Sequence, residues 1–119
     1  MIKYHKLQNS NKVAEVLPGA VVINNAEEIL DLMVEAGYRE SSAIILHSES
    51  LPASFFELKT GVAGEILQKF SNYRMRLSVV GNFSGYKSKS LQDFIRESNR
   101  TGIISFVESL DEALLKLNK

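Results

Sequence analysis

The residues with the clearest chemical potential lie where a loop meets a helix. Thr60 is followed directly by Gly61, and Gly64 comes three residues later. Apolar residues at helical spacing after Thr60 predict that a helix begins here. The first amide groups of a helix are free, and its dipole favours negative charge at that end. The Thr60 hydroxyl is therefore placed either to cap the helix or to carry a phosphate.

The same stretch is a candidate docking surface for a partner protein. Its residues combine apolar, charged and small side chains: Phe55, Phe56, Glu57, Leu58, Lys59, Gly61 and Gly64. A phosphate on Thr60 would add about two negative charges beside the apolar members of this set. The added charge would either disrupt the contact or recruit a basic partner.

A second group of polar residues follows the expected parallel strands. Loops at the carboxyl ends of such strands form the usual ligand crevice of an open α/β sheet. We expect this crevice to be lined by Ser48, Glu49, Thr60, Asn82, Ser84 and Lys87. The alternative function is therefore a small-molecule or phosphate-ligand binding protein, or an enzyme, that uses this crevice.

No complete catalytic or metal-binding pattern is visible in the sequence. The two histidines, His5 and His47, do not stand at a spacing from carboxylates that suggests zinc. Ser48 follows His47 directly, and adjacent residues of an extended chain point to opposite faces, so a nucleophile–base pair is disfavoured. The two closely spaced glycines lack the full dinucleotide-binding pattern. We expect no metal and no cofactor, and we favour a role other than catalysis while an enzyme stays open as part of the alternative.

Composition narrows the class of protein. The chain has 119 residues, of which 45% are hydrophobic and 24% are charged, and this predicts one compact domain over residues 1–119. Fourteen basic residues balance fourteen acidic ones, so we expect neither a nucleic acid nor a membrane as partner. The sequence has no cysteine, and it has no apolar run long enough for a signal peptide or a membrane span. We therefore expect a cytoplasmic protein whose partner is another protein, with a homodimer left open.

The first part of the chain predicts a hairpin and a helix. Two short β-compatible runs, 2–7 and 12–17, are separated by four polar residues, which favours an antiparallel hairpin. A third apolar run, 20–23, is expected to be another short strand. A helix then begins near Ala26, and Gly37 is expected to end it in a left-handed conformation.

The rest of the chain alternates strands with helices. Strands are predicted at 42–46, 76–81 and 102–107. The helices between and after them begin near Thr60, at Ser88 or Ser90, and at Ser109. This order predicts a single-domain α/β sandwich of about five or six strands, in which the leading hairpin is antiparallel and the other pairings are mainly parallel.

Two segments carry a resemblance to a known family. TGVAGEILQKF (60–70) and SKSLQDFIRESN (88–99) lie within 55–99, which resembles the core of a bacterial family of unknown function, domain-of-unknown-function family 4180. The similarity runs over nearly the whole chain. This resemblance implies no reaction and no site.

The junction LKTGVAGEIL (58–67) also resembles STAS domains, the anti-sigma factor antagonist class. In that class a kinase phosphorylates a hydroxyl that precedes a glycine at a helix start, and the charge breaks a protein interface. The match falls on Thr60 and Gly61. The chain departs from the pattern at Leu58, which replaces an acidic residue, and Glu57 is one position away. The resemblance implies a STAS-like fold and a small interaction or regulatory module that uses the helix near Thr60.

Overall fold

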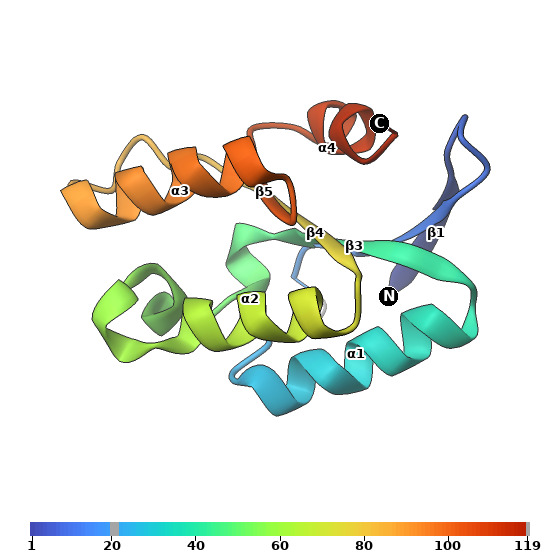
Figure 1. The fold of residues 1–119 in the computed structure, drawn as a ribbon, viewed down its shortest axis with the longest axis horizontal. Coiled ribbons are helices and arrows are strands. Elements are labelled where there is room, and N and C mark those ends of the chain that lie inside the picture. The colour runs from blue at the N-terminus through green and yellow to red at the C-terminus, as the bar shows by residue number, and fades with distance from the viewer. Residues whose placement is uncertain (20–21, 119) are drawn as a thin grey trace.

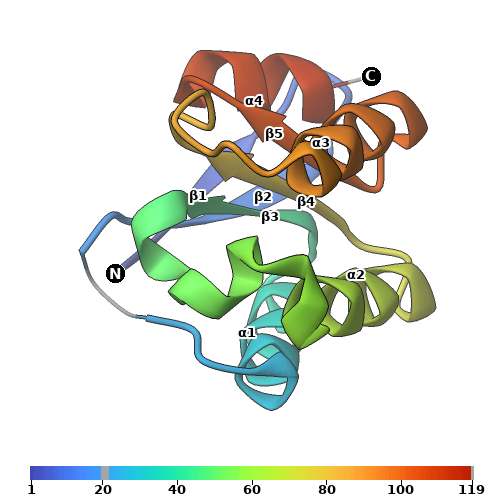
Figure 2. The same cartoon turned by 90° about the vertical axis from the view of Figure 1, so that its left-hand side faces the viewer.

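The computed structural model describes residues 1–19 and 22–118. The described residues form one five-stranded sheet in the order β1-β2-β3-β4-β5, with helices above and below it (Figures 1 and 2). The strands are β1 (Ile2–Lys6), β2 (Lys12–Val16), β3 (Ser41–His47), β4 (Arg76–Val80) and β5 (Ile104–Val107). β1 and β2 pair antiparallel, and the other three pairings are parallel. The predicted hairpin followed by a mainly parallel α/β sandwich is confirmed.

The helices are divided between two cores. They are α1 (Ala26–Tyr38), α2 (Val62–Asn72), α3 (Lys89–Thr101) and α4 (Leu110–Leu117), and three 3₁₀ turns, η1 (Ser48–Ser50), η2 (Ala53–Phe56) and η3 (Leu58–Thr60), precede α2. Buried residues of α1, α2 and α3 share one core, whereas those of α4 belong to a second core. Alternate residues of β2 and β3 enter the two cores, so each core covers one face of the sheet. Within the described residues, no helix is both long and apolar enough to cross a membrane.

Side-chain caps account for the starts of three helices. Asn25 Oδ1 accepts a hydrogen bond from the amide of Glu28 at 3.0 Å, and the Glu28 carboxylate accepts one from the amide of Asn24 at 2.9 Å. This reciprocal arrangement satisfies amides that a helix start leaves unpaired. Ser88 and Ser109 cap α3 and α4 with their hydroxyl oxygens.

Two expectations for the first half of the chain are not met. The expected strand 20–23 falls partly on residues 20 and 21, which lie outside the described residues, and Val22 and Ile23 are not in a strand. Gly37 does not end α1, because the helix continues to Tyr38 and the left-handed residue is Glu40, with φ 63°. The amide of Glu40 bonds to the Gly37 carbonyl at 2.9 Å, which closes the last turn without a left-handed glycine.

Candidate functional site

The turns before α2 present Thr60 at the surface, at the start of the helix. Gly61 is the N-cap, with φ 81°, and α2 begins at Val62. The Thr60 hydroxyl lies within hydrogen-bond distance of two carbonyl oxygens, at 2.6 Å from that of Ser54 and 2.8 Å from that of Glu57. Thr60 Oγ1 also accepts a bond from the amide of Val62 at 3.3 Å. One side chain therefore ties η2, η3 and the first turn of α2 together.

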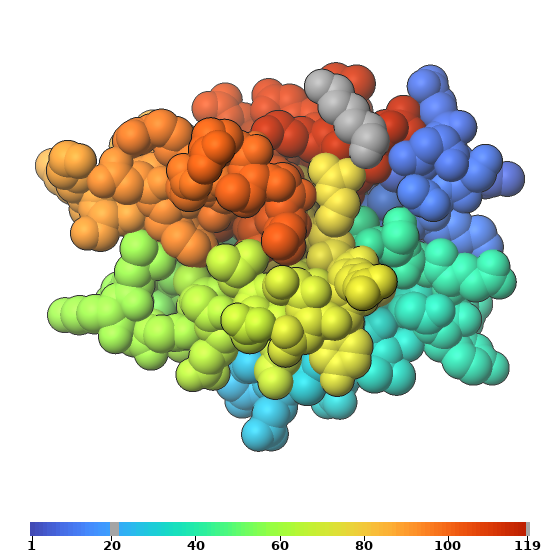
Figure 3. Space-filling model, in the orientation of Figure 1, coloured from blue at the N-terminus to red at the C-terminus, as the bar shows by residue number. Residues whose placement is uncertain are grey.

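A groove of about 360 Å³ lies between these turns and the start of α3. The turns and α3 lie next to each other in Figure 3, where they are light green and light orange. The groove is lined by Phe56, Glu57, Leu58, Lys59, Ser88 and Ser90. We call it the Thr60 groove after the residue that directly follows its lining residue Lys59; Thr60 itself is not among the lining residues. Four lining residues come from the predicted docking stretch, and the two serines come from a helix start some thirty residues later.

The two phenylalanines of the predicted docking stretch are core residues. Phe55 is fully buried and Phe56 is 7% exposed. The Phe56 ring stacks on Tyr86 with the ring centroids 4.9 Å apart, and Phe55 packs against Phe106 of β5. Burial in the aromatic core therefore removes Phe55 from the surface that we expected to dock. Phe56 keeps a small exposed edge, and Leu58, which is half-buried, is more exposed than either phenylalanine.

The other members of the docking stretch lie on the surface. Glu57, Lys59, Gly61 and Gly64 are exposed. A Cβ atom built on either glycine would meet no atom within 4 Å, so the backbone of the first turn of α2 is open to an approaching partner.

The residues expected to line a crevice form separate local contacts. Ser48, directly after β3, packs so closely on Gly81, directly after β4, that a Cβ on the glycine would lie 2.5 Å from Ser48 Oγ. Asn82 Oδ1 accepts bonds from the amide and the hydroxyl of Ser84, which closes a turn of their own. Glu49 and Lys87 are exposed. The structure thus places Asn82 in hydrogen-bond contact with Ser84. The Thr60 hydroxyl instead contacts carbonyl oxygens of the turns that directly precede it.

A buried carboxylate that the sequence analysis did not single out joins the two histidines. Glu15, on β2, is 4% exposed. Its Oε1 lies 2.8 Å from His5 Nε2, and its Oε2 lies 2.7 Å from His47 Nε2. Burial raises the pKa of Glu15, but the hydrogen bonds and charges of His47 and His5 together hold it below its ordinary value.

Strand pairing explains how this cluster forms. Glu15 stands opposite Lys3 of β1 and Ile45 of β3, so His5 and His47 are its diagonal neighbours on the same face of the sheet. An ionised carboxylate only accepts hydrogen bonds, so each Nε2 carries a hydrogen and Nδ1 is the proton-accepting nitrogen of a neutral ring.

One signal in the sequence points to this carboxylate. Glu15 lies inside the otherwise apolar run 13–16, and a charged side chain in a strand that is buried on both faces needs polar partners. The described residues contain no group of three or more His, Cys, Asp or Glu that could hold a metal ion.

Comparison with known proteins gives one match. The model of a family described as a domain of unknown function, DUF4180, matches residues 8–117. No curated protein and no solved structure gives a significant match. The family match agrees with the resemblance carried by 60–70 and 88–99, whereas the resemblance to STAS domains stays a prediction.

Proposed function

This chain belongs to the DUF4180 family, which is defined by a domain of unknown function, and we propose that it is a small interaction module whose Thr60 groove docks a partner protein. One observation carries the proposal. The Thr60 hydroxyl holds together the two turns that form one wall of the groove. A STAS-like regulatory role in the cytoplasm is consistent with this arrangement.

Modification of Thr60 would act directly on the groove wall. A phosphorylated oxygen has no hydrogen to donate, so the hydrogen bond that the Thr60 hydroxyl donates toward the carbonyls of Ser54 and Glu57 would be lost. The phosphate would also bring about two negative charges close to the Glu57 carboxylate. Both effects weaken the contact between η2 and η3, and we expect the partner to be released.

The lining of the groove defines the chemistry of the partner. The groove presents one carboxylate, one ammonium group, two hydroxyl groups and the apolar surface of Phe56 and Leu58. Such a lining suits an extended polar segment that inserts one apolar side chain. A wholly apolar helix would leave Glu57 and Lys59 unpaired at the contact.

The test is affinity capture from the native host with a set of variants. Wild type and Thr60→Ser, which keeps the hydroxyl, should recover the same partner. Thr60→Glu and Ser90→Trp, which fills the groove, should lose it. Ser71→Trp is the matched control, because Ser71 is an exposed serine on α2 that does not line the groove. Equal recovery by all variants would leave Thr60 as a structural residue only.

A second function is supported by the position of His47. This histidine ends β3, at the carboxyl end of a parallel strand. Its Nε2 is held by Glu15, so Nδ1 is left to accept a hydrogen bond from a small acidic ligand that still carries a proton, such as dihydrogen phosphate. Inorganic phosphate is the probe, and the nuclear magnetic resonance signals of the two imidazoles are the readout. Phosphate should shift the His47 signals, and the His5 signals of a His47→Gln variant should not move. Unchanged His47 signals would reject this function.

A further inference from the structure

β1 is an edge strand with one free side. In the sheet order β2 lies on one side of β1, and no described strand lies on the other (Figure 1). The amide of Leu7 bonds to the Asn11 carbonyl at 2.8 Å, and the amide of Leu17 bonds to the Met1 carbonyl at 2.9 Å. These bonds belong to one antiparallel ladder, in which bonded and non-bonded positions alternate. The odd-numbered residues of the strand therefore bond to β2.

The alternation leaves three residues of β1 with outward-pointing peptide groups. They are Ile2, Tyr4 and Lys6. Each presents one N–H and one C=O on the free side of the strand, which is a template for pairing with another strand.

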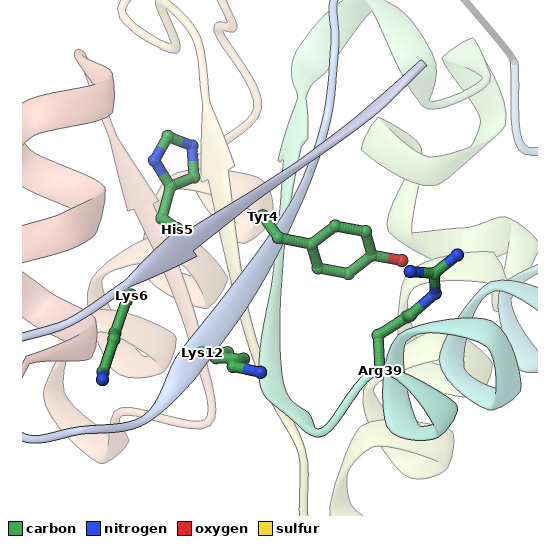
Figure 4. Close-up of a pocket in the computed structure, with 5 residues that line it drawn as sticks. All are labelled: Tyr4, His5, Lys6, Lys12 and Arg39. Atoms are coloured by element: carbon green, nitrogen blue, oxygen red, sulfur yellow. The ribbon is translucent and has the colours of Figure 1, made fainter.

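The free side of β1 is flanked by two hollows of opposite charge. The acidic groove has a volume of about 290 Å³ and lies near Ile2. Its floor is apolar, and α1 supplies three carboxylates to its rim: Glu28, Asp31 and Glu35. The basic pocket, of about 220 Å³, lies at the other end of the strand and is lined by Tyr4, His5, Lys6, Lys12 and Arg39 (Figure 4).

The basic pocket gathers three cations, those of Lys6, Lys12 and Arg39. Lys6 and Lys12 stand directly opposite each other in the β1–β2 pair, where like charges are destabilising. Arg39 lies over the Tyr4 ring, 5.9 Å from its centroid. In the described part of the chain these three cations form no ion pair, and the carboxylates of Asp31 and Glu35 form none either.

We propose that two copies of this chain pair through their β1 strands, antiparallel, about a two-fold axis beside Tyr4. In this register Tyr4 stands opposite Tyr4 of the partner subunit, and Ile2 stands opposite Lys6 of the partner subunit. Outward-pointing peptide groups then meet outward-pointing groups at each pair, and each pair exchanges two N–H···O bonds. The two sheets become one continuous sheet.

The same register brings the two hollows together. Because Ile2 lines the acidic groove, Lys6 of the partner subunit lies at the mouth of that groove, and the two-fold axis repeats the contact. A shift of one residue would set outward-pointing peptide groups against inward-pointing ones, and it would turn Lys6 away from the carboxylates. Charge and hydrogen bonding therefore select the same arrangement.

The dimer is independent of the proposed docking function. β1 and the turns that line the Thr60 groove lie at opposite ends of the molecule in Figure 1. Two copies joined through β1 therefore keep both Thr60 grooves open.

The test is sedimentation equilibrium at low salt over a wide range of concentration. Wild type should approach twice the chain mass of 13.3 kDa. Lys6→Glu and Asp31→Lys should each weaken the dimer about tenfold or more, since each reversal acts twice across the axis. The double variant Lys6→Glu/Asp31→Lys restores opposite charges and should recover dimerisation.

Lys59→Glu is the matched control, because it reverses an exposed lysine far from β1 and should leave the dimer unchanged. Circular dichroism of each variant should match that of the wild type, which would establish that the variants are folded. A wild type that stays monomeric at all concentrations, a dimer that tolerates Lys6→Glu, or a double variant that is no better than the single ones would overturn the proposal.

Discussion

The imidazole of His47 lies 2.7 Å from one oxygen of Glu15, and this contact crosses from β3 to β2. The other oxygen of Glu15 is held by His5 of β1. A carboxylate that is almost fully buried needs such partners, because an unpaired buried charge is strongly unfavourable. The cluster therefore joins the antiparallel hairpin to the parallel part of the sheet.

Glu15→Gln should destabilise the fold. The glutamine amide has one acceptor oxygen where the carboxylate has two, and its other group is an NH2 donor. One of the two imidazole N–H groups would therefore face another donor instead of an acceptor. We expect the free energy of unfolding in urea to fall by about 1–3 kcal/mol. Glu49→Gln, at an exposed position, is the matched control and should change it by less than about 0.5 kcal/mol. Similar losses for both variants would show that the histidine contacts contribute nothing.

The contribution of Glu15 should depend on pH in one direction. Its pKa is lower in the folded state, so the unfolded chain takes up a proton first as the pH falls. The stabilisation is complete above the ordinary carboxyl pKa of about 4.3 and is lost as the pH drops through the lower folded value. The gap in unfolding free energy between wild type and Glu15→Gln should therefore narrow in acid. A gap that stays constant through this range would contradict the expectation.

Two glycines in neighbouring turns should respond to alanine in opposite ways. Gly61 has φ 81°, a conformation that costs a residue with a Cβ about 1 kcal/mol, so Gly61→Ala should lower stability. Gly64 lies within α2 with open space around it, so Gly64→Ala should raise stability by about 0.5–1 kcal/mol. Thermal unfolding of the two variants measures both effects. Shifts of the same sign would show that the turn before α2 differs from this description.

Gly81→Ala should be destabilising because of Ser48. The new methyl group would lie 2.5 Å from Ser48 Oγ and 2.7 Å from its Cβ, so the two strand ends must separate. We expect a loss of about 1–3 kcal/mol, as for other overpacked sites. The second substitution Ser48→Gly should restore part of it, and Gly85→Ala, which meets no atom within 4 Å, is the control. Additive effects of the two changes would rule out the contact.

Local sequence signals were sufficient for most of the fold. The predicted strand 42–46 holds a continuous apolar run at 43–46, as expected for a strand covered on both faces, and it lies within β3. Asn25 and Ser109 are helix caps because their side chains reach amides three residues ahead. α1 continues through Gly37 because the amides of Arg39 and Glu40 bond to carbonyl oxygens of the last helical turn, including that of Gly37. These backbone bonds outweigh the tendency of glycine to end a helix.

The sites depend on contacts that sequence spacing does not reveal. Glu15 is ten residues from His5 and thirty-two from His47, and only the register of three strands brings them together. The Thr60 groove likewise needs α3 to pack beside η3, which places Ser90 near Lys59. Phe55 was expected at the surface, and its burial follows from an aromatic cluster with members in β5 and in the loop before α3.

The strands lie in the sheet in the same order as in the chain. Each strand after the first therefore joins the edge that the preceding strand has just left open, and none has to insert between two that are already paired. As the chain leaves the ribosome, the sheet can grow in one direction from the hairpin, and α4 covers the second face last.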